Sequence, residues 1–177
     1  MKITNTKFSG IKLIEADLFS DKRGYLREIY KKNKLKKNLV FHYFAKSKKN
    51  VFRGFHFQAK NQQEKLVSVL EGSIIDISID LRRNSKTFGK IFKVLLSEKN
   101  RKSIFIPKGF AHGYLSLDKS NLVYFKNSNY RDADQERGII WNDIDLNIKW
   151  SYKKPLISKK DKQNMSYKEF LKTYKSI

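Results

Sequence analysis

SIIDISIDL (residues 73–81) alternates in polarity in the way that a β-strand does. Successive side chains of a strand point to opposite faces, so this segment has two distinct faces. One face holds Ile75, Ile77, Ile79 and Leu81, and the other holds Ile74, Asp76, Ser78 and Asp80. Alternating aspartates are typical of a solvated strand face, so we expect the second face to be exposed to water.

Short apolar segments recur on both sides of this strand, with turn-forming residues between them. They span residues 11–16, 25–30, 39–44, 51–58, 65–70, 90–97, 103–106, 113–117 and 121–127. Glu71 and Gly72 predict a hairpin turn that joins 65–70 to 73–81. The regular spacing of these segments predicts an antiparallel sandwich or barrel.

One helix is expected near the end of the sequence, in MSYKEFLKTYKSI (165–177). Ser166 and Glu169 stand at capping-box spacing. Tyr167, Leu171 and Tyr174 follow at helical intervals and would dock one face of the helix on the sheet. We therefore expect a mostly β fold with a short C-terminal helix, in a single domain over residues 1–177.

The composition narrows the class of protein. The chain has 177 residues and no cysteine, which excludes disulfides and thiolate metal sites. No apolar stretch is long enough for a signal peptide or a membrane span, so we expect a soluble cytoplasmic protein. The net charge of +22 comes mostly from lysines spread along the chain. Because no nucleic-acid motif accompanies it, this charge favours a solvated surface over a nucleic-acid-binding face. A phosphorylated small-molecule substrate is the third option, and it needs only a few of these cations.

Three polar features interrupt the apolar pattern: His56 in VFRGFHFQ (51–58), the pair Asp76 and Asp80, and His112 in FIPKGFAHGYLSL (105–117). Taken singly, each is more typical of a structural residue than of a functional one. The three histidines of the chain are not clustered, so we expect no metal site. The sequence also lacks a G-x-S-x-G elbow, a Walker A motif and a Rossmann glycine fingerprint.

Five runs of sequence, taken together, resemble the dTDP-4-dehydrorhamnose 3,5-epimerase family. They are DKRGYLREIY (21–30), SKKNVFRGFHFQ (47–58), EKLVSVLEGSIIDISIDLRRNSKTFGK (64–90), FIPKGFAHGYLSL (105–117) and NYRDADQERGIIWND (129–143). The resemblance covers roughly residues 8 to 161 and implies a cupin-like jelly-roll sandwich, a cytoplasmic homodimer, and neither metal nor cofactor. It implies a nucleotide-linked 4-keto-6-deoxy sugar as substrate, inverted at C3, C5 or both, in deoxysugar biosynthesis for surface polysaccharide.

The resemblance also implies catalytic roles. His56 matches the base, and Asp161 matches the carboxylate that orients it. Lys65 matches a lysine near the developing enolate oxygen, and His112 lines the same pocket. Asp76, grouped with the substrate-binding residues, is expected to position Lys65 or His112.

Further residues match contacts to the nucleotide sugar. Arg23, Arg53 and Lys160 match anion contacts, Glu28 and Glu136 match polar contacts, and Tyr130 matches the aromatic that stacks on the base. Arg53 and His56 are three positions apart, so a straight strand would point them to opposite faces. Both reach one pocket only if the strand bends or bulges, and Gly54 is the natural place.

The chain departs from the family pattern at two places. The position of the family's acid tyrosine, in LVYFKNSNY (122–130), is occupied by Phe125. Alternation aims the adjacent Tyr124 at the other face, unless a one-residue bulge turns it inward. Either another group or a water donates the proton, or one inversion is lost. The second departure is FHYF (41–44), where the family usually has Gln and Asn that contact substrate. His42 matches no family role, and we interpret it as structural.

Two other functions share the fold and the substrate class. A nucleotide-sugar 3,4-ketoisomerase also moves protons next to a carbonyl, but it relocates the ketone. A non-catalytic nucleotide-sugar-binding cupin would bind the substrate without turnover. The leading hypothesis is the epimerase, because His56, Lys65, His112 and Asp161 stand in family order.

Overall fold

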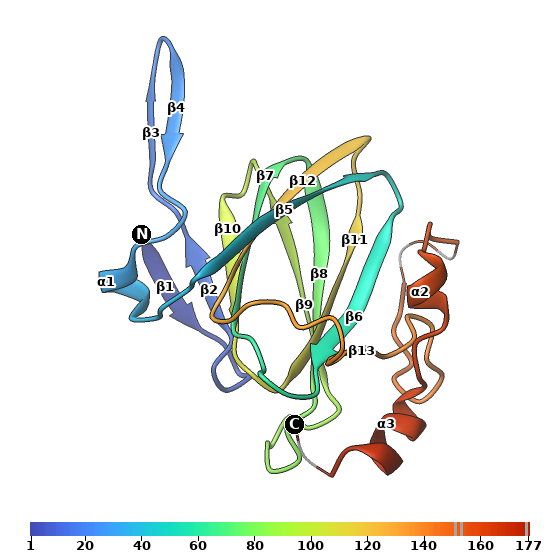
Figure 1. The fold of residues 1–177 in the computed structure, drawn as a ribbon. Helices are drawn as coiled ribbons and strands as arrows, with labels where there is room; N and C mark the ends of the chain where they lie inside the picture. Colours follow the sequence, from blue (N-terminus) through green and yellow to red (C-terminus); the bar gives the residue numbers. More distant parts are fainter. Residues whose placement is uncertain (151, 153, 176) are drawn as a thin grey trace.

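The computed structural model describes residues 1–150, 152, 154–175 and 177, and antiparallel strands are its main regular structure (Figure 1). The strands are β1 (Lys2–Asn5), β2 (Lys12–Glu15), β3 (Leu18–Asp21), β4 (Gly24–Arg27), β5 (Phe41–Lys48), β6 (Phe52–Gln58), β7 (Lys65–Glu71), β8 (Ser73–Asp80), β9 (Ile91–Ser97), β10 (Lys102–Ile106), β11 (Phe110–Ser116), β12 (Ser120–Asn127) and β13 (Glu136–Gly138). The helices are α1 (Lys32–Leu35), α2 (Lys159–Lys162) and α3 (Tyr167–Thr173). Every apolar segment named above overlaps a strand, whereas the pattern does not predict β1, β3 or β13.

Two sheets build the sandwich. The six-stranded sheet has the order β1-β2-β10-β7-β12-β5, and the five-stranded sheet has the order β13-β6-β11-β8-β9. Val67, Val123 and Phe125 of the first sheet share one buried cluster with Ile74 and Tyr114 of the second, so the core lies between the sheets. This mostly β sandwich confirms the expected cupin-like jelly roll with a short C-terminal helix, α3, whereas α2 was not predicted.

The strand β8 is buried on both faces, so the expectation of a solvated face is wrong. Asp76, Ser78 and Asp80 are all fully buried. Ile77 and Ile79, on the other face, pack into a second core that the C-terminal segment covers. The carboxylates are therefore compensated by partners rather than by water, and Asp80 accepts hydrogen bonds from Arg82, Ser85 and Thr87.

The predicted hairpin at Glu71 and Gly72 is also wrong. β7 and β8 follow one another directly in sequence, but β7 belongs to the six-stranded sheet and β8 to the five-stranded sheet. Gly72 has φ +76°, a conformation that favours glycine, and the chain crosses there from one sheet to the other. A turn residue marks a change of direction but does not determine which strand becomes the hydrogen-bonded neighbour.

The C-terminal segment packs beside β6 and β13 (Figure 1). The capping box of Ser166 and Glu169 is confirmed, with both reciprocal hydrogen bonds present. Phe170 is the fully buried anchor of α3 and packs edge-on against Phe57 of β6. Among the described residues, no helix combines the length and the apolar character needed to cross a membrane.

A two-stranded hairpin, β3–β4, projects from the body of the sandwich (Figure 1). Phe19, Tyr25 and Leu26 are exposed along it. Arg23 lies at its tip, where its guanidinium pairs with Asp21. The hairpin therefore exposes an apolar surface and a cation at a distance from the rest of its own chain.

Candidate active site

A cavity of about 700 Å³ lies between the two sheets, within the size range of small-molecule sites. The six-stranded sheet contributes Phe41, Tyr43, Ala45, Lys65, Phe125 and Asn127 to its lining. The five-stranded sheet contributes Arg53, His56, Gln58, His112, Tyr114 and Glu136. Residues 156–158, Lys160 and Asp161 close one side of the cavity.

A bulge in β6 brings Arg53 and His56 to the same cavity, as the sequence spacing requires. Tyr114 of β11 is opposite Arg53, and His112 is opposite His56. A step of three residues along β6 therefore pairs with a step of two residues along β11, which defines the bulge. Gly54 has φ +131°, and a Cβ there would lie 2.5 Å from the Cα of Gly113. Only glycine permits this close approach of the two strands, which confirms the predicted position of the bulge.

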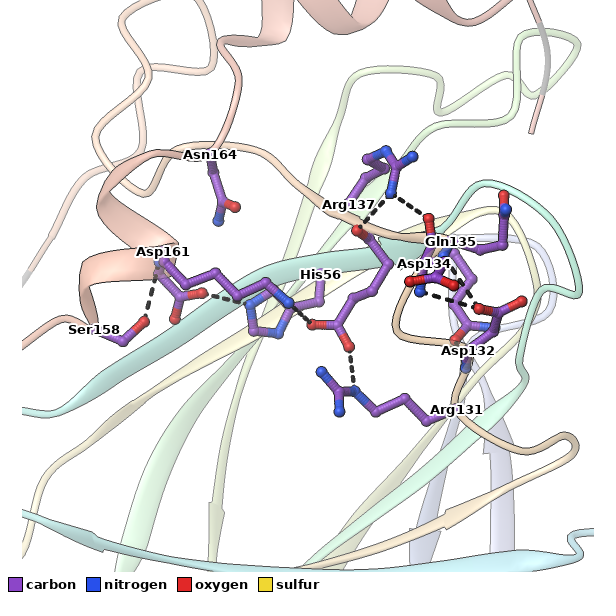
Figure 2. Close-up of polar contacts among 12 residues, drawn as sticks. His56, Arg131, Asp132, Asp134, Gln135, Arg137, Ser158, Asp161 and Asn164 are labelled. Carbon is purple, nitrogen blue, oxygen red and sulfur yellow. Dashed lines mark hydrogen bonds and ion pairs between the residues drawn. The ribbon is translucent and has the colours of Figure 1, made fainter.

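His56 is paired with Asp161 across the edge of the cavity (Figure 2). Its Nε2 lies 2.7 Å from Oδ1 of Asp161, whose side chain is 6% exposed. An ionised carboxylate only accepts hydrogen bonds, so Nε2 carries the proton and Nδ1 keeps its lone pair. Nδ1 makes no hydrogen bond within the described chain, so this arrangement leaves a basic nitrogen available.

Local structure of α2 positions Asp161. Ser158 is the N-cap of α2, and its hydroxyl accepts the backbone N–H of Asp161 (Figure 2). The second carboxylate oxygen accepts the N–H of Gly54 at 3.4 Å. Burial acts to raise the pKa of Asp161, but the interaction with His56 and the hydrogen bonds with Gly54 and Ser158 together outweigh it, so the pKa is lowered. The carboxylate therefore stays ionised beside the imidazole.

His112 forms a second histidine–carboxylate pair, in the interior. Its Nε2 lies 2.7 Å from Oδ2 of Asp76, and both side chains are buried. Asp76 is absent from the cavity lining, because it lies behind His112. Of the two partners expected for Asp76, the hydrogen bond goes to His112 and not to Lys65.

Lys65 places a cation in the cavity at the start of β7. Burial lowers the pKa of Lys65 to about 8, and the charges of Glu136 and Asp76 oppose this effect. In the part of the chain that the structure describes, its ammonium forms neither a hydrogen bond nor an ion pair. A desolvated cation without a partner is suited to stabilise negative charge that develops on a bound molecule.

Glu136 links the cavity to two cations, Arg131 and Lys160. Its Oε2 accepts Nε of Arg131 at 2.5 Å, and its Oε1 accepts Nζ of Lys160 at 2.7 Å. Burial acts to raise the pKa of Glu136, but the two cations outweigh it and lower the pKa to about 2. Sequence reasoning missed Arg131, although it stands next to Tyr130 in the run NYRDADQERG.

Aromatic rings form the wall that faces His56. Phe125 of β12 lies directly opposite Tyr43 of β5, and the two rings stack with centroids 4.8 Å apart. Tyr114 is close to the same ring, and its hydroxyl bonds Ser47. The pairing of β5 with β12 is regular, so Tyr124 points to the outer face, as alternation predicts.

His42 also lies outside the cavity lining, on the outer face beside Tyr124. Its Nε2 is 3.0 Å from the carbonyl oxygen of Leu39, which supports the structural interpretation. No group of three or more metal-ligating side chains occurs among residues 1–150, 152, 154–175 and 177.

Three further residues expected at the substrate lie away from the cavity of their own chain. Arg23 is at the tip of the β3–β4 hairpin, and Glu28 pairs with Lys31 beyond its base. Tyr130 is 65% exposed, outside the cavity lining, with its ring 5.7 Å from that of Phe41. Arg23 and Glu28 were assigned from motifs alone, and motifs do not tell whether a residue serves its own chain or a neighbour.

The cavity therefore combines an imidazole base, a carboxylate that fixes its tautomer and a buried cation. This set can remove a proton next to a carbonyl and stabilise the resulting enolate.

Residues 5–169 match the sequence profile of the family described as dTDP-4-dehydrorhamnose 3,5-epimerase. The chain is 37% identical to the dTDP-4-dehydrorhamnose 3,5-epimerase of Methanothermobacter thermautotrophicus, over 91% of each protein. It is also 37% identical to the enzyme of that name from Shigella flexneri, over 91% of this chain and 93% of the relative.

Solved structures agree with the sequence comparison. The dTDP-4-dehydrorhamnose 3,5-epimerase of Bacillus anthracis, with TDP and PPi bound, is 36% identical with a TM-score of 0.90, over 93% of this chain and 98% of that one. A dTDP-6-deoxy-D-glucose-3,5-epimerase of Legionella pneumophila, in complex with dTDP-4-keto-L-rhamnose, is 34% identical with a TM-score of 0.89, over 93% of this chain and 92% of that one.

Proposed function

The chain belongs to the dTDP-4-dehydrorhamnose 3,5-epimerase family, and from this premise we propose that it epimerises a dTDP-linked 4-keto-6-deoxy sugar in the cytoplasm. The observation that carries the proposal is the His56–Asp161 pair, which faces a cavity that also holds the cation of Lys65, unpaired among the described residues. The enzyme is an isomerase, and its substrate loses and regains a proton at a carbon next to the ketone.

Proton removal is assigned to His56. The C4 ketone acidifies the hydrogens at C3 and C5, so a neutral imidazole can take one of them. The ionised Asp161 holds Nε2–H and stabilises the imidazolium that forms when Nδ1 receives the proton. The electron pair of the broken C–H bond moves toward the C4 oxygen, which becomes an enolate.

Lys65 is assigned to the enolate oxygen. Its ammonium is desolvated before the reaction, so it interacts more strongly with a developing anion than a solvated lysine would. We assign His112, held by Asp76, to the same region of the cavity, because His112 is opposite His56 in the strand register.

The diphosphate and the base are assigned to the cationic side of the cavity. Arg53 and Arg131 line it, and Lys160 is held there by Glu136. Guanidinium groups bind phosphate oxygens with two parallel hydrogen bonds, which fixes the orientation of the nucleotide. Tyr130 is free to stack on the base, since its ring is largely exposed next to Phe41.

A homodimer completes this assignment. Arg23 and Glu28 are away from the cavity of their own chain, and the hairpin beside them exposes Phe19 and Leu26. A second copy of the chain would cover this apolar surface and receive the two charged residues near its own cavity.

The experiment that tests the function is solvent deuterium exchange. The enzyme is incubated in D₂O with a dTDP-linked 4-keto-6-deoxyhexose, and deuterium at C3 and C5 is followed by NMR. Exchange at one or both carbons, reduced to a small residual rate in His56→Asn, is the expected result. Absence of exchange at both carbons, across several nucleotide and sugar variants, would refute the proposal.

The number of inverted centres depends on what returns the proton. Phe125 carries no proton to donate, so one inversion is lost unless another group acts on the face opposite His56. If the inversion is lost, Phe125→Tyr adds or accelerates the second inversion. Equal rates of inversion at C3 and C5 in the wild-type enzyme would exclude the loss.

Product analysis separates the alternatives. A 3,4-ketoisomerase would move the ketone from C4 to C3, and a binding cupin would bind the nucleotide sugar with no exchange. Family membership favours the epimerase over both. A role in surface polysaccharide follows from the resemblance, and sugar analysis of polysaccharide from a strain that lacks the gene would test it.

A further inference from the structure

We propose that the hydroxyl of Tyr43 is the acid that returns the proton on the face opposite His56. This inference rests on the proposed epimerase function, because it concerns the second half of the same reaction. Inversion requires a donor on the face that the base does not occupy. Any donor must therefore come from the wall of the cavity that faces the strand of His56.

The lining of that wall leaves one suitable group. His56 and His112 belong to the five-stranded sheet, so they share the side of the base. Tyr114 belongs to the same sheet, and its hydroxyl is already hydrogen-bonded to Ser47 of β5. Among the described residues that line the cavity from the six-stranded sheet, only Tyr43 and Lys65 can release a proton. Lys65 is assigned to the enolate oxygen, which leaves Tyr43 for the carbon.

The position of Tyr43 relative to Phe125 supports the same assignment. The two residues are direct cross-strand partners of β5 and β12. Their rings stack with centroids 4.8 Å apart and an interplanar angle of 10°. The phenol ring on β5 therefore lies beside and parallel to the phenylalanine ring on β12. The two departures from the family pattern, distant in sequence, meet at one place in the fold.

The surroundings of Tyr43 suit proton donation. Burial raises the pKa of its hydroxyl, and the side chain of Asn127 offsets part of the effect, so the phenol is protonated at neutral pH. The residue is 37% exposed, which gives water access to the ring. In this step, the electron pair of the enolate C=C bond forms the new C–H bond with the proton of Tyr43, and the C4 ketone is restored. The phenolate that remains then takes a proton from water. His56 releases its own proton to water, and both groups are restored.

Tyr43→Phe tests the proposal, because it removes one oxygen and keeps the stacked ring. Exchange and inversion are measured separately by NMR in D₂O on the same dTDP-linked 4-keto-6-deoxyhexose. We expect exchange within about threefold of the wild-type rate, since His56 can return deuterium to the face it deprotonates. We expect inversion to fall by roughly 10²- to 10⁴-fold, the usual contribution of a general acid.

The double variant Tyr43→Phe/Phe125→Tyr moves the phenol back to β12 and should recover inversion to within about tenfold. Tyr124→Phe is the matched control, since it removes the same atom on the outer face, and it should change neither rate. Wild-type inversion in Tyr43→Phe would overturn the proposal. So would an equal loss of exchange and inversion in Tyr43→Phe, or a selective loss of inversion in Tyr114→Phe. A wild-type enzyme without exchange would instead refute the epimerase function.

Discussion

Replacement of Asp161 by asparagine should slow proton abstraction about 100-fold without unfolding the protein. The carboxylate lies 2.7 Å from Nε2 of His56 and is almost fully buried, so its charge is poorly screened by water. A hydrogen bond to a charged group contributes about 1.5–3 kcal/mol, and the burial places this one near the upper end. At about 1.36 kcal/mol for each factor of ten in rate, the loss is roughly 10- to 150-fold.

The assay is the rate of deuterium incorporation at C3 and C5 in D₂O, measured for Asp161→Asn, His56→Asn and the double variant. If Asp161 acts through His56, the double variant exchanges no more slowly than His56→Asn alone. Asparagine preserves the shape of the side chain, so thermal unfolding should change little. The reasoning is refuted if Asp161→Asn exchanges within threefold of wild type, or if the two losses multiply in the double variant.

Three other predictions follow from the same structure. Burial lowers the pKa of Lys65 to about 8, and its charged form is the active one. A pH–rate profile should therefore show kcat/KM falling as pH rises through 8. Lys65→Met should lower the rate and remove this alkaline fall. Gly54→Ala would place a Cβ 2.5 Å from the Cα of Gly113 at φ +131°. The substitution should lower the free energy of unfolding by more than about 1 kcal/mol and lower Tm by at least roughly 2–4 °C. A Tm equal to that of the wild type would contradict the steric argument. Phe19→Ser/Leu26→Ser on the β3–β4 hairpin should convert a dimer to a monomer in light scattering, whereas a wild-type monomer would count against the homodimer.

The candidate site was largely predictable because its chemistry is encoded in short motifs. His56, Lys65, His112 and Asp161 were named from sequence runs, and all four lie at one cavity. The need for a bulge at Gly54 also followed from spacing, since a three-residue step in a strand reverses the face. These inferences depend on local periodicity and on motif order, which the chain carries whatever its tertiary contacts.

Other features required the assembled sandwich. The alternation in SIIDISIDL predicted the strand β8 but not its environment, because the burial of its aspartates depends on partners outside the strand, His112 for Asp76 and Arg82 for Asp80. The sheet that β8 joins after Gly72 depends on pairing between strands that are distant in sequence. Arg131 was missed because its role depends on the fold of the loop that brings it to Glu136.

The sequence by itself determined ten of the thirteen strands in the described part of the chain and the capped C-terminal helix, since each depends on neighbouring residues. The order of its motifs, through the family resemblance, identified the catalytic histidine of the hypothesis. Only the tertiary structure decided what faces His56. Tyr43 and Phe125 are 82 positions apart in the chain, and they become neighbours through the register of β5 and β12. Cross-strand register is set by hydrogen bonds and burial over the whole sheet, so no local pattern could have placed a phenol beside the phenylalanine.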